Sequence, residues 1–397
     1  MPNSSRPADF VGFCAQDWWY HNRAHSDFQL LIHLARTRKV LMINSIGMRL
    51  PTPGKSTKFL SRIWRKLKSM RRFVAPAGEE YPNVWVMSPI SVPVYGNRVL
   101  RWANSTALAW QVRLVCKLKG FNRPHVMLTI PTALDAAKKL PRHSMIYNRS
   151  DKHSLFPEAD TALIESFEEA LFREADRVMY CSRELMREEL PKTGGRAVFL
   201  DHGVVRARFE PVSEEEVHAD VRAIPRPRIG YFGNIANYRV DVGIFRRLAA
   251  ELPDAHMVLV GNVHEEIDDF LALPNVHHLG FRDHSEIPSI GSGFDVAIMP
   301  WALTDWIRYC NPIKMKEYLC LGLEAVSMTA PEVEHYADVL HVAKTPDEFI
   351  ELVKRVLDGT APAKDATKRA DLIARSDWSN RAAELAEIAE AAAAHAG

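Results

Sequence analysis

The sequence predicts an α/β protein in which two open parallel sheets follow one another along the chain. The 397 residues are too many for one ordinary domain, so two domains of similar size are expected. Short apolar runs alternate with helical patterns in both halves, and strands that alternate with helices pair in parallel through crossover connections. The stretch 206–228 interrupts the alternation with clustered acidic residues and two prolines, which is typical of a linker.

The first series of elements fills the first half of the chain. Apolar residues at helical spacing predict a helix at 27–37 that Ser26 caps, and a long helix at 98–119. Further helices are expected at 133–140, 158–174 and 182–190, and strands at 11–15, 39–43, 84–88, 126–130, 144–147, 177–181 and 197–200.

The second series repeats this alternation. Helices are expected at 242–252, 265–273, 313–321 and 346–357, and strands at 229–233, 257–260, 276–279, 296–300 and 324–328. Since ligands of open parallel sheets bind at the carboxyl ends of the strands, each half is expected to offer a site, with the two sites facing across a cleft. The expected organisation is a domain at 1–205, a linker at 206–226, a domain at 227–375 and a C-terminal helix at 376–397.

Composition excludes several classes of protein. Hydrophobic residues make up 47% and charged residues 25% of the chain, as in globular proteins, and a net charge of +2 is no general argument for nucleic acid. Five scattered cysteines without a Cys-x-x-Cys pair predict reduced thiols, and no signal peptide or membrane-spanning apolar run is found. The histidines show no metal-type spacing and there is no Asp-x-Asp pair, so no metal or other cofactor is expected. A cytoplasmic protein is therefore expected.

The segment from Asn311 to Gly322, NPIKMKEYLCLG, carries the strongest chemical signal. Proline after asparagine predicts the start of a helix, and the N–H groups at a helix start bind anions. Lys314 in the first turn suits a diphosphate, and Glu317, three residues later on the same face, suits the hydroxyl groups of a ribose. The alternative is a surface helix with an ordinary Lys–Glu pair.

This segment resembles the Asn/Ser-Pro-x-Lys-x-x-Glu-Tyr motif of GT-B glycosyltransferases of the family-4 type, also called glycosyl transferases group 1. The turn IGYFGN at 229–234 and the stretch 275–300 resemble the donor-binding domain of that group. The resemblance implies two Rossmann-like domains, a hexosyltransferase activity, a UDP-linked sugar as donor, and a C-terminal helix that packs back towards the first domain. The donor-binding residues that it implies are Gly233, Asn234, Arg239, Asn311, Ile313, Lys314 and Glu317. For Arg239, in ANYRVD, a solvated loop arginine is the alternative.

One position departs from the family pattern. Retaining members often carry an acid eight positions before the glutamate that matches Glu317, but here that position is Tyr309 and the nearest acid is Asp305. The stereochemical outcome therefore stays open. His202, which precedes Gly203, is a further candidate for a contact near the phosphates, with a structural role as its alternative.

Two aspartates of the first half are candidates for a catalytic base. Asp151, in YNRSDKHS, follows an expected strand, and this segment resembles the part of the xanthan-assembly glucuronosyltransferase in which a Ser-Asp pair supplies the base. Asp17, in AQDWWYHNR, matches an acid of the same relative, and teichuronic-acid-type transferases share part of the likeness. An inverting transfer needs such a base to take the proton of the acceptor hydroxyl. Both aspartates have the alternative of a turn or cap residue.

A basic segment at 55–73 contains eight Lys or Arg residues and no acid. Its apolar residues recur at helical spacing, which is the pattern of an interfacial amphipathic helix, and each base near an anionic leaflet contributes on the order of 1 kcal/mol. The alternative is a core helix with a solvated basic face, and no nucleic-acid motif accompanies it. The candidates for membrane or acceptor contact are Lys58, Arg62, Trp64, Arg65, Lys66, Lys68, Arg71 and Arg72.

The expected partners are a nucleotide-sugar donor, a glycan or lipid-linked acceptor of polysaccharide or glycolipid assembly, and an anionic membrane surface on the inner face of the cell membrane. Two other functions remain open. One is a nucleotide-sugar epimerase on the same fold, against which the basic segment argues because a soluble sugar nucleotide needs no membrane. The other is a catalytically inactive scaffold at the membrane.

Overall fold

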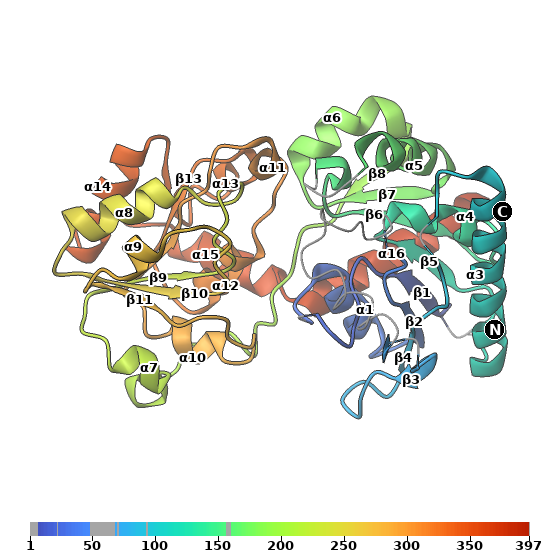
Figure 1. The fold of residues 1–397 in the computed structure, drawn as a ribbon, viewed down its shortest axis with the longest axis horizontal. Coiled ribbons are helices and arrows are strands. Elements are labelled where there is room, and N and C mark those ends of the chain that lie inside the picture. Colours follow the sequence, from blue (N-terminus) through green and yellow to red (C-terminus); the bar gives the residue numbers. More distant parts are fainter. Residues whose placement is uncertain are drawn as a thin grey trace. The chain divides into compact units, whose positions relative to one another are not determined.

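The computed structural model describes residues 7–21, 23–47, 68–69, 71–92, 94–155 and 160–396. The chain forms two compact units, each built on its own sheet (Figure 1). Unit 1 comprises Met1–Cys181, Leu185–Asp201 and Trp378–Gly397, and unit 2 comprises Ser182–Glu184 and His202–Asp377.

Unit 1 contains an eight-stranded sheet in the order β3-β4-β2-β1-β5-β6-β7-β8. All neighbouring strands are parallel except β3, which runs antiparallel to β4. The strands are β1 Phe10–Phe13, β2 Val40–Ile43, β3 Val74–Pro76, β4 Val84–Met87, β5 His125–Leu128, β6 Met145–Arg149, β7 Arg177–Tyr180 and β8 Ala197–Phe199. The helices that go with this sheet are α1 Ser26–Leu34, α3 Arg98–Lys119, α4 Leu134–Ala137, α5 Thr161–Glu174 and α6 Arg183–Thr193, of which α6 begins in unit 2.

The last helix, α16 Trp378–Ala396, belongs to unit 1 although the preceding part of the chain belongs to unit 2. It packs on α1, and Figure 1 shows it in red among the blue and green elements of that unit. Its buried residues recur every three or four positions, which gives the helix one apolar face. These residues are Trp378, Ala382, Leu385, Ala386, Ala389 and Ala392.

Unit 2 contains a six-stranded, fully parallel sheet in the order β11-β10-β9-β12-β13-β14. The strands are β9 Arg228–Phe232, β10 His256–Val260, β11 Val276–His278, β12 Val296–Met299, β13 Ala325–Met328 and β14 His341–Ala343. The helices are α7 Ala219–Arg222, α8 Val242–Glu251, α9 Asp268–Leu271, α10 Ile287–Gly291, α11 Asp305–Arg308, α12 Ile313–Cys320, α13 Pro331–Glu334, α14 Pro346–Leu357 and α15 Ala366–Arg375.

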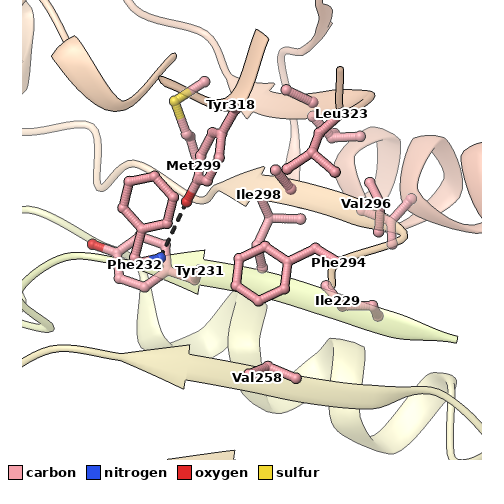
Figure 2. Packing of buried hydrophobic residues seen from close by; sticks show 14 of the residues in the cluster. Ile229, Tyr231, Phe232, Val258, Phe294, Val296, Ile298, Met299, Tyr318 and Leu323 are labelled. Carbon is pink, nitrogen blue, oxygen red and sulfur yellow. Dashed lines mark hydrogen bonds between the residues drawn. The ribbon is translucent and has the colours of Figure 1, made fainter. Parts of the chain in front are cut away.

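Buried hydrophobic residues of unit 2 pack around β9 and its neighbouring strands (Figure 2). A methyl group built on Gly230 would lie 1.9 Å from the ring of Phe294, so only glycine lets this ring rest on the strand. The central strands β9, β10 and β12 are buried along nearly their whole length, as expected for a sheet that helices cover on both faces.

The predicted α/β class with two parallel sheets is confirmed, and each predicted strand has an observed counterpart within two residues. Some helical predictions were too long, because α9 and α4 have only four residues each. The predicted cap of α1 is wrong, since His25 and not Ser26 is the N-cap residue and no side chain caps it among the described residues.

The expected linker also differs from what the structure shows. Much of the stretch 206–226 packs into unit 2 and carries helix α7. Four of its apolar residues, Phe209, Val217, Val221 and Ile224, are buried in the core of that unit. A linker between domains is exposed and makes few contacts, whereas this stretch is packed into the core of one unit.

Candidate functional site

The candidate site of unit 2 lies where the strand order of its sheet reverses. The chain runs from β9 to β10 and β11 on one side, and later from β12 to β13 and β14 on the other. In open parallel sheets, such a switch point leaves a crevice at the carboxyl ends of the two central strands. Here those ends are Gly233 after β9 and the Pro300–Trp301 pair after β12.

Glycines at the ends of β9 and β10 keep this edge of the sheet open. Gly233 has a φ of 143°, and a methyl group on it would lie 2.4 Å from Nζ of Lys314. Gly261 has a φ of 134°, and a methyl group on it would lie 2.2 Å from the carbonyl oxygen of Gly233. Side chains at either position would therefore displace the lysine or the turn.

Lys314 projects from the first turn of α12 to the end of β9. Its Nζ donates a hydrogen bond to the hydroxyl of Tyr231 at 3.1 Å and lies 4.3 Å and 5.0 Å from the ring centres of Tyr231 and Trp301. Loss of hydration and, to a smaller extent, the charge of Arg239 lower the pKa of Lys314 to about 7, and the charge of Glu317 opposes this shift. An anion beside Nζ would restore the favourable environment of the ammonium group.

Arg239 is a second cation near Lys314. Its charge lowers the pKa of Lys314 and opposes the rise that burial causes in the pKa of Tyr231. Its guanidinium lies 5.3 Å from the ring centre of Tyr238 and 5.7 Å from that of Trp306. Among the described residues, no acceptor meets its buried Nε atom or the buried Nε1 atom of Trp301. These donors are suited to a ligand rich in oxygen acceptors.

The loop that carries Arg239 is tied to the segment after β12. The carbonyl oxygen of Arg239 accepts a hydrogen bond from the amide of Ala302 at 3.0 Å, and that of Tyr238 accepts one from the hydroxyl of Thr304 at 2.9 Å. The same hydroxyl caps the short helix α11. Both sides of the switch point are thereby held together.

Glu317 is buried, and one carboxylate oxygen lies 2.8 Å from Nε2 of His284. The imidazole ring of His284 in turn lies 5.3 Å from the ring of Phe209. Sequence reasoning missed His284, because it is separated from Glu317 by 33 positions and has no spacing that points to it. The only signal is that it lies in the stretch 275–300 that resembles the donor-binding domain.

Helix α12 is anchored to the end of β9 by Tyr318. Its hydroxyl accepts a hydrogen bond from the amide of Phe232 at 3.1 Å, and the two rings lie 4.5 Å apart (Figure 2). Pro312 is the N-cap residue of α12, and no described side chain caps the helix start. The helix ends as predicted before Gly322, which has a φ of 77°.

The other residues predicted for this site are spread around it. Asn234 is exposed, and its carbonyl oxygen accepts a hydrogen bond from the hydroxyl of Tyr231 at 3.1 Å. Asn311 is buried and Ile313 is half-buried at the start of α12. Tyr309 is buried with the guanidinium of Arg308 5.3 Å from its ring, and His202 is half-buried at the beginning of the longer part of unit 2.

Comparisons with known proteins rest on structure alone, because no protein-family model and no curated protein matches the sequence. Sucrose-phosphate synthase from Thermosynechococcus elongatus superposes with a TM-score of 0.70 at 14% identity, covering 98% of this chain and 100% of that one. A glycosyltransferase from Rickettsia africae gives 0.66 at 10% identity, with 98% and 99% covered. Anabaena HepE in complex with UDP gives 0.65 at 14% identity, with 96% and 100% covered. The chain has the GT-B fold.

In this GT-B chain, Asp17 lies just beyond the end of β1, the strand at which the order of the first sheet reverses. One carboxylate oxygen accepts a hydrogen bond from the hydroxyl of Ser69 at 2.8 Å, and the other accepts one from the amide of Trp19 at 3.0 Å. Ser69 also lies 2.7 Å from the hydroxyl oxygen of Ser88. Asp17 is thus buried within a hydrogen-bond network that joins the ends of several strands.

Asp151 lies two residues beyond the end of β6 and is half-buried. Its carbonyl oxygen accepts a hydrogen bond from Arg149 at 2.9 Å. Arg149 is fully buried and forms ion pairs with Glu168 and, at 2.8 Å, with Glu189. Burial raises the pKa of the Glu168 carboxyl group although Arg149 opposes this. The buried ion-pair cluster therefore fixes the backbone on which the Asp151 carboxylate is carried.

Most of the predicted basic segment lies outside the described residues, including Lys58, Arg62, Trp64, Arg65 and Lys66. Lys68, Arg71 and Arg72 are described and exposed, and the guanidinium of Arg72 lies 4.9 Å from the ring centre of Trp19. In the part of the chain that the structure describes, no helix has the length and apolar character to cross a membrane. No group of His, Cys, Asp or Glu in that part is arranged to hold a metal ion.

Proposed function

We propose that the protein is a glycosyltransferase that moves a sugar from a UDP-linked donor to a glycan or lipid-linked acceptor. The observation that carries this proposal is the pair of cations at the switch point of the second sheet. Lys314 and Arg239 both lie at the open end of β9, where the two glycine turns leave space and where buried N–H donors have no partner within the described chain. A diphosphate supplies the negative charge and the acceptor oxygens that such a place requires.

We assign roles to the site residues from their positions. Lys314, Arg239 and the start of α12 are suited to the diphosphate, and we expect them rather than a metal ion to neutralise it. Glu317 is suited to the ribose hydroxyl groups, since its carboxylate is held by His284 on one oxygen. Anabaena HepE, which shares the fold, has been crystallised with UDP and with UDP-glucose, which supports UDP as the nucleotide.

For the transfer step we propose Asp151 as the base that takes the proton of the acceptor hydroxyl. Asp17 is the weaker candidate, because both of its carboxylate oxygens already accept hydrogen bonds from protein groups. Tyr309, which takes the position of an acid in many retaining relatives, is buried against Arg308. With Asp151 as the base, the transfer would be an inverting one.

Calorimetric titration with UDP tests the donor site. Lys314→Ala should weaken UDP binding by about tenfold to a hundredfold, since a hydrogen bond to a charged group contributes roughly 1.5–3 kcal/mol. Lys344→Ala, which removes an exposed lysine of the same unit, is the matched control and should leave affinity unchanged. Equal UDP affinity in wild type and Lys314→Ala would refute the assignment of the site.

Turnover separates the proposed function from its alternatives. Asp151→Asn should abolish transfer while UDP still binds, because only the base is removed. Conversion of a sugar nucleotide to its epimer without an acceptor would instead identify an epimerase. If the wild type binds no UDP at all, the inactive scaffold would be the remaining alternative.

A further inference from the structure

The outward side of helix α3 is an unusual surface. The helix spans 22 residues, about 33 Å, and is well formed at both ends. The side chain of Asn97 caps its start by accepting hydrogen bonds from the amides of Val99 and Leu100, and Gly120, with a φ of 67°, ends it. Its buried side is narrow and consists of Ser105, Leu108, Ala109, Gln111, Val112 and Val115. Figure 1 shows α3 as a long helix along the edge of its unit.

The opposite side carries large apolar residues where a surface helix normally carries charges. Val99 is 72% exposed, Trp102 and Trp110 are each 64% exposed, and Leu118 is 73% exposed. Val99 and Trp110 are eleven positions apart, about three turns, and so lie along one line of the helix. Two further exposed apolar residues, Ile90 and Val92, lie on the loop before the helix.

Hydrogen bonds hold that loop against the helix. The amide of Ile90 donates to Oε1 of Gln111 at 2.9 Å, and the amide of Val92 donates to Oδ1 of Asn104 at 3.2 Å. We call the exposed apolar residues of the loop and the helix together the α3 face; they are Ile90, Val92, Val99, Leu100, Trp102, Trp110 and Leu118. Large exposed apolar residues that gather on one helix and its preceding loop point to an interaction site.

The charges around the α3 face indicate what it meets. Helix α3 contains five basic residues and no acidic one. Arg101 pairs with Asp135, whereas Arg98, Arg113, Lys117 and Lys119 are exposed. An anionic surface that is apolar just beneath its charges complements this combination, whereas a neutral apolar partner would leave the bases unmatched.

We propose that the α3 face docks on an anionic lipid bilayer. Trp102 and Trp110 then lie at the level of the lipid headgroups, where tryptophan is favoured, and Arg113 and Lys117 contact lipid phosphates. The helix lies in the plane of the interface and does not cross the bilayer. This proposal does not depend on the function proposed above, because every residue that carries it belongs to unit 1 and the candidate donor site belongs to unit 2.

Sedimentation of the full chain with vesicles tests the proposal. The wild type should bind vesicles that contain phosphatidylglycerol and phosphatidylcholine, and bind pure phosphatidylcholine vesicles far more weakly. Since each base near the surface contributes about fivefold, Arg113→Glu with Lys117→Glu should lower partitioning by at least about 25-fold. Arg36→Glu with Lys192→Glu makes the same change of charge at exposed positions elsewhere in unit 1 and should have a small effect.

Tryptophan fluorescence identifies the face that binds. Phospholipids brominated on their acyl chains should quench the wild type, and Trp102→Phe with Trp110→Phe should remove most of the quenching. Unchanged quenching in that variant would mean that another part of the chain meets the lipid, and would overturn the proposal. So would equal binding of neutral and anionic vesicles, or a dimer in ultracentrifugation that Trp110→Glu dissociates. UDP affinity should be equal in all these variants, so a failure here is distinguishable from a failure of the donor site.

Discussion

The lowered pKa of Lys314 makes the charge of the candidate site depend on pH near neutrality. With a pKa of about 7, caused by burial and by Arg239, the lysine is only partly charged in the protein without a ligand. A diphosphate favours the ammonium form, so binding should take up a proton when the pH exceeds 7. Lys314 is thus neutral or cationic according to pH near 7, whereas an exposed lysine stays charged there.

The affinity for UDP should therefore fall as the pH rises from 7 to 9, by on the order of tenfold per pH unit. Over this range the diphosphate itself stays ionised, because the last phosphate pKa is about 6. Calorimetry in buffers of different ionisation enthalpy measures both the affinity and the number of protons taken up. Lys314→Arg keeps its charge throughout and should remove the pH dependence. A slope that is the same in both proteins would assign the titration to another group.

Gly233 is the residue whose missing side chain makes room for Lys314. In Gly233→Ala the new methyl group would meet Nζ of Lys314, so UDP affinity should fall by at least tenfold. The same change also strains the backbone, at a cost of roughly 1–3 kcal/mol in the free energy of unfolding.

Gly78→Ala separates these two effects. Gly78 has a φ of 149°, close to that of Gly233, but a methyl group there meets no atom within 4 Å. Gly78→Ala should lower the free energy of unfolding, measured with urea, by about as much as Gly233→Ala does, and should retain full UDP affinity. If Gly233→Ala also retains full affinity, Lys314 is free to move away and the close approach of the two residues has no role in binding.

At the scale of the elements, helix α12 is held in place by a contact between Tyr318 and β9. The hydroxyl of Tyr318 is the acceptor for the amide of Phe232, the last residue of the strand, and both residues are buried. Tyr318→Phe leaves that amide without its partner and should lower the free energy of unfolding by about 1–3 kcal/mol. Because the helix start carries Lys314, UDP affinity should decrease as well.

Tyr95→Phe is the matched control for this prediction. Tyr95 is also buried, and its hydroxyl donates to the carbonyl oxygen of Gly47 at 2.7 Å within unit 1. Loss of this bond should lower stability by a similar amount without changing UDP affinity. Equal affinities in Tyr318→Phe and wild type would show that the position of α12 does not depend on this hydrogen bond.

The elements also show what can be predicted from sequence. Most of the strands are identified because they are short apolar runs bounded by turn residues, although β3 and β14 are not among the expected strands. Lys314 and Glu317 are found together because they lie on one helix. The contacts of His284 with Glu317 and of Tyr231 with Lys314 are not found from the sequence. They depend on how the chain folds in three dimensions, which no local pattern encodes. The stretch 206–226 is mistaken for a linker because its prolines and acids mask apolar residues that tertiary packing buries.

At the scale of the whole molecule, the chain builds two separate cores and then returns to the first one. The two sheets belong to different units, and α16 contributes its apolar face to unit 1. Units with their own cores can unfold in separate steps. We expect calorimetry of the full chain to show two unfolding transitions. UDP should raise the melting temperature of the unit 2 transition only, because it binds the native state of that unit.

Two matched substitutions test this division. Leu385 in α16 and Leu248 in α8 are both fully buried, and replacing either by alanine should cost about 2–5 kcal/mol. Leu385→Ala should lower the melting temperature of the transition that does not respond to UDP, although Leu385 follows unit 2 in the sequence. Leu248→Ala should lower the melting temperature of the transition that UDP raises. If Leu385→Ala instead lowers the UDP-responsive transition, α16 stabilises the donor-binding core and the two units do not unfold separately.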